Sequence, residues 1–264
     1  MSDLRHAIES DQLELYYQPK LNIHTATITG VEALLRWNHP DRGFIPPEEM
    51  VKIAERTGLI KQLTLWVLEA ALCQCADWVK HGVDLKVAVN LSVLNLQDPE
   101  LPQQVGGFLE KYKLAADKLS LEITEGAMMA DPESAISNLT RLDKMGIRLS
   151  VDDFGTGFSS LAYLKRLPVD ELKIDKSFVL DMESDENDAA IVRSTIDLAH
   201  NLGLKVVAEG VEHHALLTSL SSHGCDVAQG YYIARPMDVK SLNEWMAISY
   251  YPAENHVDDQ SKMN

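Results

Sequence analysis

The chain alternates between short segments in which every second residue is apolar and longer segments in which apolar residues recur every three or four positions. The first pattern is typical of a β-strand with one buried face, and the second indicates an amphipathic helix. Strands are predicted at residues 13–18, 27–36, 85–91, 119–124, 147–152, 171–174, 205–209 and 226–230. The clearest helices are predicted at residues 60–80, 135–145 and 189–202.

The connections between these strands predict how the strands are arranged. The first two are joined by KLNIHTA, which is too short to contain a helix, so this pair is expected to be antiparallel. The remaining strands alternate with helices, and eight such strands in 264 residues favour a closed barrel over an open doubly wound sheet. We predict an α/β fold, a TIM-like (β/α)8 barrel with an antiparallel first strand, over residues 1–249. A polar, disordered tail is predicted at residues 250–264.

The polar positions of the strands predict what fills this barrel. The apolar face of each strand must pack against the helices, so the polar face points into the lumen. An ordinary barrel lumen is filled by bulky branched side chains instead. The inward residues near the carboxyl ends of the strands are expected to be Glu32, Asn90, Glu122, Asp152, Lys173, Glu209 and Gln229. Because so many buried carboxylates repel one another, we predict that cations lie among them.

The chemistry of the candidate ligands indicates which ion they would hold. The ligands are oxygen donors, and none of the nine histidines lies at a predicted strand end, which favours Mg²⁺ or Mn²⁺ over zinc. Four carboxylates and an amide exceed the needs of one magnesium ion, so two ions bridged by Asp152 are expected. Taken alone, the segment DDFGTG that begins at Asp152 favours a solvated Asx turn, and the acids of the neighbouring strands favour the metal site.

Composition and charge limit the partners and the compartment. The formal net charge of −16 repels nucleic-acid phosphates, so duplex nucleic acid is excluded as a partner and a phosphate substrate would need cations nearby. No apolar stretch is long enough to span a bilayer, and the polar N-terminus does not resemble a signal peptide. The three cysteines, Cys73, Cys75 and Cys225, form no disulfide framework and are predicted to be buried thiols, which indicates a cytoplasmic location.

Several motifs occur together in one order: VEALLRWNHP, VNLS, LEITE, DDFGTGFSSLAYLKRLPVDELKIDKSFV, VVAEGVE and QGYYIARP. Together they resemble the EAL domain, the bacterial cyclic-di-GMP-specific phosphodiesterase, over residues 4–246. The family fold is a TIM-like barrel whose first strand runs antiparallel. Because each mapped motif position is intact, the resemblance implies a working enzyme.

The resemblance also implies roles for individual residues. It assigns one metal ion to Glu32, Asn90, Glu122 and Asp152, and a second to Asp152, Asp153 and Glu209. It assigns catalytic roles to Lys173, which contacts the attacking water, to Glu209, and to Glu125, which anchors the loop after Asp153. It assigns substrate binding to Arg36, Leu35, Gln18, Gln229 and Glu212. The glycines after Asp153 permit movement of the chain, so a mobile gate is predicted at Phe154, Gly155, Thr156 and Gly157.

The expected activity is hydrolysis of cyclic di-GMP to linear 5′-pGpG. Two Mg²⁺ or Mn²⁺ ions would share a water, and the resulting hydroxide would attack phosphorus in line. Calcium is expected to occupy the site and inhibit. The family also implies a homodimer, and a sensory domain is expected if the chain is an excised domain. Two alternatives remain: a catalytically silent cyclic di-GMP receptor, and an enolase-type barrel that uses Lys173 as a base.

Overall fold

The structure is a computed structural model, and it describes residues 2–10, 12–126, 131–156 and 161–249. Gly157 and the predicted tail at residues 250–264 lie outside these residues. The strands are β1 (Leu13–Asn22), β2 (Thr27–His39), β3 (Gly43–Ile45), β4 (Lys86–Leu91), β5 (Leu119–Thr124), β6 (Arg148–Phe154), β7 (Glu171–Ile174), β8 (Lys205–Ala208) and β9 (Val227–Ala228).

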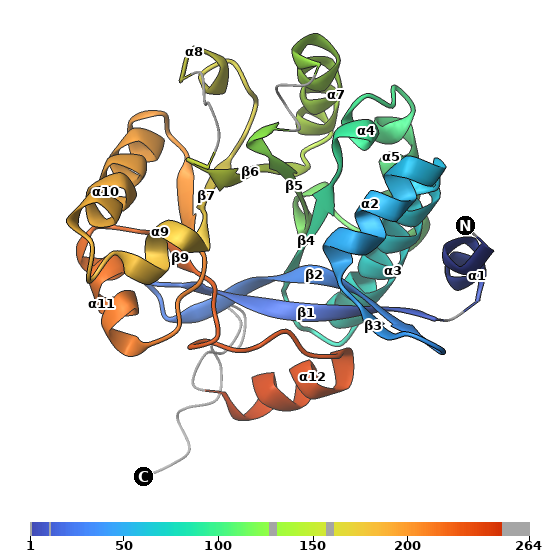
Figure 1. Cartoon of the computed structure of the whole chain (residues 1–264), viewed down its shortest axis with the longest axis horizontal. Coiled ribbons are helices and arrows are strands. Elements are labelled where there is room, and N and C mark those ends of the chain that lie inside the picture. The colour runs from blue at the N-terminus through green and yellow to red at the C-terminus, as the bar shows by residue number, and fades with distance from the viewer. Residues whose placement is uncertain (1, 11, 127–130, 157–160, 250–264) are drawn as a thin grey trace.

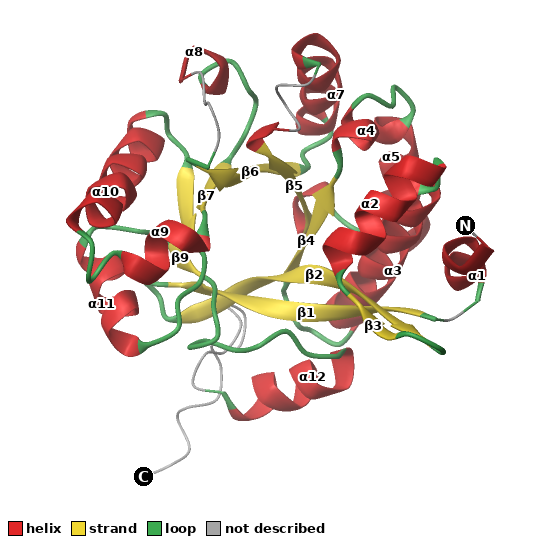
Figure 2. Cartoon of the chain, in the orientation of Figure 1, coloured by secondary structure: helices red, strands yellow, loops and turns green. Residues whose placement is uncertain are grey.

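Helices surround these strands (Figure 2). They are α1 (Ser2–Glu9), α2 (Pro47–Thr57), α3 (Ile60–Lys80), α4 (Val93–Leu96), α5 (Leu101–Tyr112), α7 (Pro132–Lys144), α8 (Leu161–Leu164), α9 (Lys176–Asp181), α10 (Glu186–Asn201), α11 (His214–Ser222) and α12 (Val239–Ile248), with a 3-10 turn at Ala116–Lys118. Within the described ranges, no helix is both long enough and apolar enough to cross a lipid bilayer.

The strands close into a barrel in the order β1-β9-β8-β7-β6-β5-β4-β2, and β1 pairs with β2 to complete the ring (Figure 1). Strand β1 runs antiparallel to both of its neighbours, whereas the pairs from β2 to β4 and onward to β9 are parallel. The predicted TIM-like barrel with an antiparallel first strand is therefore confirmed. Strand β3 was not predicted, and it extends the β1–β2 hairpin outside the barrel by pairing Trp37 with Ile45.

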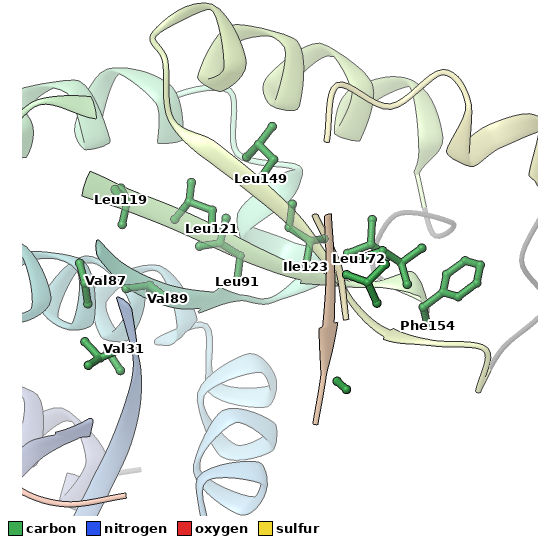
Figure 3. Close-up of a cluster of buried hydrophobic side chains, with 14 of the residues drawn as sticks. Val31, Val87, Val89, Leu91, Leu119, Leu121, Ile123, Leu149, Phe154 and Leu172 are labelled. Carbon is green, nitrogen blue, oxygen red and sulfur yellow. The ribbon is translucent and has the colours of Figure 1, made fainter. Parts of the chain in front are cut away.

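The core lies between the strands and the helices, as the alternation predicted. Val87 and Val89 of β4 and Leu121 of β5 are completely buried, and Figure 3 shows them in one continuous cluster. Helix α3 covers this part of the barrel with Leu68 and Leu72, which are equally inaccessible. Burial of one such side chain contributes about 1.5–3 kcal/mol to the free energy of unfolding.

The cysteine prediction is correct at two positions and wrong at one. Cys75 and Cys225 are fully buried, and burial raises the pKa of the Cys75 thiol to about 11. Cys73 lies two positions before Cys75 on α3, which is more than half a helical turn, so it faces solvent and is exposed.

Gly230 allows two segments at the carboxyl ends of β8 and β9 to cross closely. A Cβ added at Gly230 would lie 2.2 Å from the carbonyl oxygen of Val211, and the Val211 N–H donates to the carbonyl oxygen of Gln229. We expect Gly230→Ala to lower the free energy of unfolding by about 1–3 kcal/mol, because the backbone must move apart. Urea unfolding measures this.

A matched control is Gly107→Ala in α5, where the added methyl meets no atom within 4 Å. Because alanine favours the helix, this variant should gain about 0.5–1 kcal/mol. Equal unfolding free energies for the two variants would contradict the close crossing at Gly230.

Candidate functional site

Lys173 lies at the centre of the polar cluster inside the barrel. It follows Leu172 and precedes Ile174 on β7, and because both neighbours are completely buried on the outer face, Lys173 points into the lumen. The Nζ atom is 2.6 Å from Glu122 Oε2, 2.8 Å from Glu209 Oε1, 3.1 Å from Asp152 Oδ1 and 3.6 Å from Glu32 Oε2. The predicted inward orientation of these acids is therefore confirmed, and they meet around one ammonium group.

Strand register brings these acids together although they are far apart in the sequence. In the parallel pair β4–β5, Asn90 lies opposite Glu122, and in β5–β6, Thr124 lies opposite Asp152. Glu209 directly follows β8. Since parallel strands end at the same edge of the sheet, all these side chains gather at the carboxyl mouth of the barrel.

Burial and two lysines, Lys173 of β7 and Lys20 of β1, determine which of these groups are charged. Burial opposes ionisation of Glu122, but Lys173 and Lys20 outweigh it and lower the pKa of Glu122 to about 2. Burial raises the pKa of Glu32 and of Asp152, and it raises that of Glu209 to about 7. Burial alone would lower the pKa of Lys173, yet the surrounding carboxylates raise it well above its usual value. The lysine is therefore charged, and the cluster retains an excess of acids.

The raised pKa of Glu209 predicts how the metal-free protein responds to pH. Unfolded Glu209 loses its proton near pH 4.5, whereas folded Glu209 keeps it until about pH 7. Between these values the folded state binds more protons, so its free energy of unfolding falls as the pH rises and levels off above about 7. We expect Glu209→Gln to flatten this slope. Urea unfolding in chelator between pH 5 and 8 measures it, and parallel curves for the two proteins would contradict the prediction.

Asp152, Asp153 and Glu209 form the part of the cluster best suited to a cation. One ligand oxygen from each lies within 4.8 Å of the other two. Asp153 has a positive φ of 54°, and its N–H donates to Asp152 Oδ1 at 3.0 Å. The Thr156 hydroxyl and N–H donate to the carbonyl oxygen of Asp153, so a tight turn is present beside the acids. A carboxylate-only group of this kind fits a hard divalent ion.

A chain of amide groups holds Glu32 in the same mouth. Its Oε1 accepts from Asn90 at 2.7 Å, and its Oε2 accepts from Gln229 at 2.7 Å. Gln229 also donates to Gln18, which donates in turn to the carbonyl oxygen of Ala234. The Gln229 Oε1 atom is buried without a hydrogen-bond partner among the described residues, so it is available to a bound ion, water or substrate.

The contact expected between Glu125 and the loop after β6 is present. Glu125 is buried directly after β5, and its Oε2 accepts from the N–H of Gly155 at 3.4 Å. The prediction of Phe154 as a loop residue is wrong. Strand β6 continues two residues beyond the predicted end, and Phe154 pairs with Ile174 and packs into the core. Gly155 and exposed Thr156 follow the strand.

Three predicted substrate contacts lie outside the buried cluster. Arg36 is on the same face of β2 as Glu32 but four residues further along, and its guanidinium lies 5.2 Å from the centre of the Tyr16 ring. Leu35 packs against the hydrophobic core. Glu212 is exposed between β8 and α11. The role of each in substrate binding stays a prediction.

Two polar residues of the site were missed from the sequence. Lys20 was assigned to the connection after the first strand, but β1 continues to Asn22 and carries Lys20 into the lumen, where it contacts Glu122. The alternation from Gln18 to Lys20 is the signal that could have found it. Asp175, the N-cap of α9, lies beside Asp153 and, after burial, contributes most to raising the pKa of that carboxyl group.

Comparison with known proteins agrees with this geometry. The EAL domain family model matches residues 1–236. The bifunctional diguanylate cyclase/cyclic di-GMP phosphodiesterase MucR of Pseudomonas aeruginosa is 45% identical over 243 residues, which cover 92% of this chain and 36% of MucR. The cyclic di-GMP phosphodiesterase NbdA of the same organism is 43% identical over 245 residues, which cover 92% of this chain and 31% of NbdA. The chain thus spans about a third of the length of these relatives.

Solved structures give the same result. The PaMucR phosphodiesterase in complex with c-di-GMP has a TM-score of 0.87 and 45% identity, and the match covers 91% of this chain and 98% of that one. The FimX EAL domain of P. aeruginosa bound to c-di-GMP has a TM-score of 0.83 and 27% identity, covering 89% of this chain and 95% of that one. This chain belongs to the EAL domain family.

Proposed function

We propose that the chain hydrolyses cyclic di-GMP to linear 5′-pGpG in a reaction that depends on Mg²⁺ or Mn²⁺. The observation that carries this proposal is the meeting of four carboxylates around Lys173 at the carboxyl mouth, with the Asp152, Asp153 and Glu209 oxygens within 4.8 Å of one another. Support comes from relatives named as cyclic di-GMP phosphodiesterases and from the c-di-GMP bound to PaMucR.

The oxygen donors of the mouth fit two hard divalent ions. Glu32, Asn90, Glu122 and Asp152 would hold one ion, and Asp152, Asp153 and Glu209 would hold the other. When bound, such ions lower the pKa of a water molecule and offset the charge of a phosphodiester. The unpartnered Gln229 Oε1 adds a further oxygen donor at the same mouth.

The remaining steps belong to side chains of this protein. Lys173, held by carboxylates and charged, orients the attacking water and stabilises negative charge on the phosphoryl oxygens. The planar fork of Arg36 binds a phosphate oxygen pair at the rim. Glu209, whose Oε1 lies 2.8 Å from the Lys173 ammonium, is the side chain proposed to accept a proton from that water. In-line attack forms one P–O bond and breaks the bond to the opposite ribose 3′-oxygen, which takes up a proton.

One assay distinguishes this enzyme from the alternatives. Cyclic di-GMP is incubated with the protein and Mg²⁺, Mn²⁺, Ca²⁺ or chelator, and the products are separated. We expect pGpG with Mg²⁺ or Mn²⁺ and intact substrate with Ca²⁺ or chelator, because calcium is larger and less strict in its geometry. Binding without turnover in all four conditions would identify a silent receptor. An enolase-type enzyme would leave cyclic di-GMP unbound and would need a carboxylate substrate.

We further propose a cytoplasmic homodimer whose loop after β6 acts as a gate over the site. Gly155 has a φ of 97°, a conformation that glycine adopts without strain, and Glu125 fixes the base of the loop. Light scattering tests the dimer, and a monomer at micromolar concentration would refute it.

A further inference from the structure

A second buried lysine lies beneath the proposed active site. Lys20 is only 7% exposed, and it reaches into the lumen from β1, the strand that runs antiparallel to its neighbours. Its Nζ donates to Glu122 Oε1 and lies 3.8 Å from Glu171 Oε1. Neither contact follows from the metal-ligand assignment, so Lys20 needs an explanation of its own.

Lys20 and Lys173 each bind a different oxygen of the Glu122 carboxylate. Glu122 is completely buried, with Oε1 on Lys20 and Oε2 at 2.6 Å from Lys173. Lys20 contacts it from the amino-terminal side of the lumen, where Glu171 begins β7, and Lys173 contacts it from the carboxyl mouth. Each oxygen is therefore fixed by a different cation.

The loss of Lys20 would change how the two Glu122 oxygens are bound. A buried carboxylate oxygen without a partner is costly, so Glu122 would turn to give both oxygens to Lys173. A paired contact of that kind would draw the Lys173 ammonium away from Glu209, now at 2.8 Å, and from Asp152, at 3.1 Å. The lysine and one proposed metal ligand would then both be misplaced.

We propose that Lys20 is a positioning residue, which holds Glu122 from below so that Oε2 and Lys173 face the reacting phosphodiester. This inference rests on the proposed function for its kinetic consequences. Its structural content, the position of Glu122, does not depend on any activity.

The first test compares two lysines of the same barrel end. Lys86 is exposed at the start of β4 and, like Lys20, lines a cavity of about 380 Å³ at the amino-terminal mouth. We expect Lys20→Met to lower kcat for cyclic di-GMP by about 10–100-fold, the usual effect of removing the partner of a metal ligand, with KM nearly unchanged. Lys86→Met should match the wild type. Equal kcat for all three proteins would overturn the proposal.

The cavity supplies a second test, because it leads from solvent to Lys20 on the side opposite the substrate. In Lys20→Ala, a small primary alkylammonium ion such as propylammonium can enter this space and take the place of the lost Nζ. We expect kcat to rise several-fold with added amine in Lys20→Ala and not in Lys86→Ala. Loss of activity with no rescue would assign Lys20 to packing alone and overturn the proposal.

A crystal structure of metal-free Lys20→Met tests the inference without an activity. We expect both Glu122 oxygens on Lys173, and Glu122 in its original position would overturn the proposal. If the wild type leaves cyclic di-GMP intact, the proposed function fails and this structure alone decides the role of Lys20. Should the methionine variant fail to fold, Lys20→Gln keeps a donor to Glu122 and should show the same change to a smaller extent.

Discussion

Glu32→Ala is expected to lower turnover of cyclic di-GMP by at least about 10³-fold, equivalent to about 4 kcal/mol of transition-state stabilisation. Glu32 is the proposed metal ligand on β2, and it also accepts hydrogen bonds from Asn90 and Gln229. Removing its carboxylate takes away one ligand and leaves the two amide groups that face it without their acceptor. Steady-state kinetics with Mg²⁺ or Mn²⁺ measures the effect.

Glu110→Ala is the matched control for this prediction. Glu110 is exposed near the end of α5, a helix on the outside of the barrel. Its loss removes one carboxylate without touching the mouth, so turnover should stay at the wild-type level. Near-normal turnover by folded Glu32→Ala would remove Glu32 from the proposed ligands.

The inward acids could be predicted because strand alternation is a local property. Val89 and Leu121 face the helices. Because side chains alternate along a strand, the residues that follow them, Asn90 and Glu122, had to face the lumen. The distances between side chains of different strands depend on the strand register, which the alternation within one strand does not give. The 2.6 Å contact between Lys173 and Glu122 depends on the stagger of β5, β6 and β7, which is set by the closed ring as a whole.

Strand ends were the weaker part of the prediction. Lys20 was missed because the short connection KLNIHTA was taken to begin at this residue, although β1 continues past a bulge between Lys20 and Leu21. Phe154 was placed in a loop because the segment DDFGTG favours a turn, yet pairing with Ile174 keeps it in β6. The repulsion among the buried carboxylates indicated that cations must lie among them. The structure shows that Lys20 and Lys173 supply part of this positive charge.

Lys173→Met is expected to separate catalysis from binding. General acid–base and positioning groups contribute about 10²–10⁴-fold to turnover, so kcat should fall within that range. Cyclic di-GMP affinity should change much less, because Arg36 and the proposed metal ligands remain. Single-turnover kinetics and calorimetric titration, measured on the same preparation, give the two quantities, and equal losses in both would contradict a role for Lys173 in the chemical step.

The same variant should also become dependent on metal for its stability. Lys173 is the cation shared by Glu32, Glu122, Asp152 and Glu209, and removal of one partner from a buried ion pair costs about 3–5 kcal/mol. In chelator, the melting temperature of Lys173→Met should therefore fall below that of the wild type. Mn²⁺ should raise it more in the variant than in the wild type, because the ions then supply the missing positive charge. A variant as stable as the wild type in chelator would show that the acids need no cation at this position.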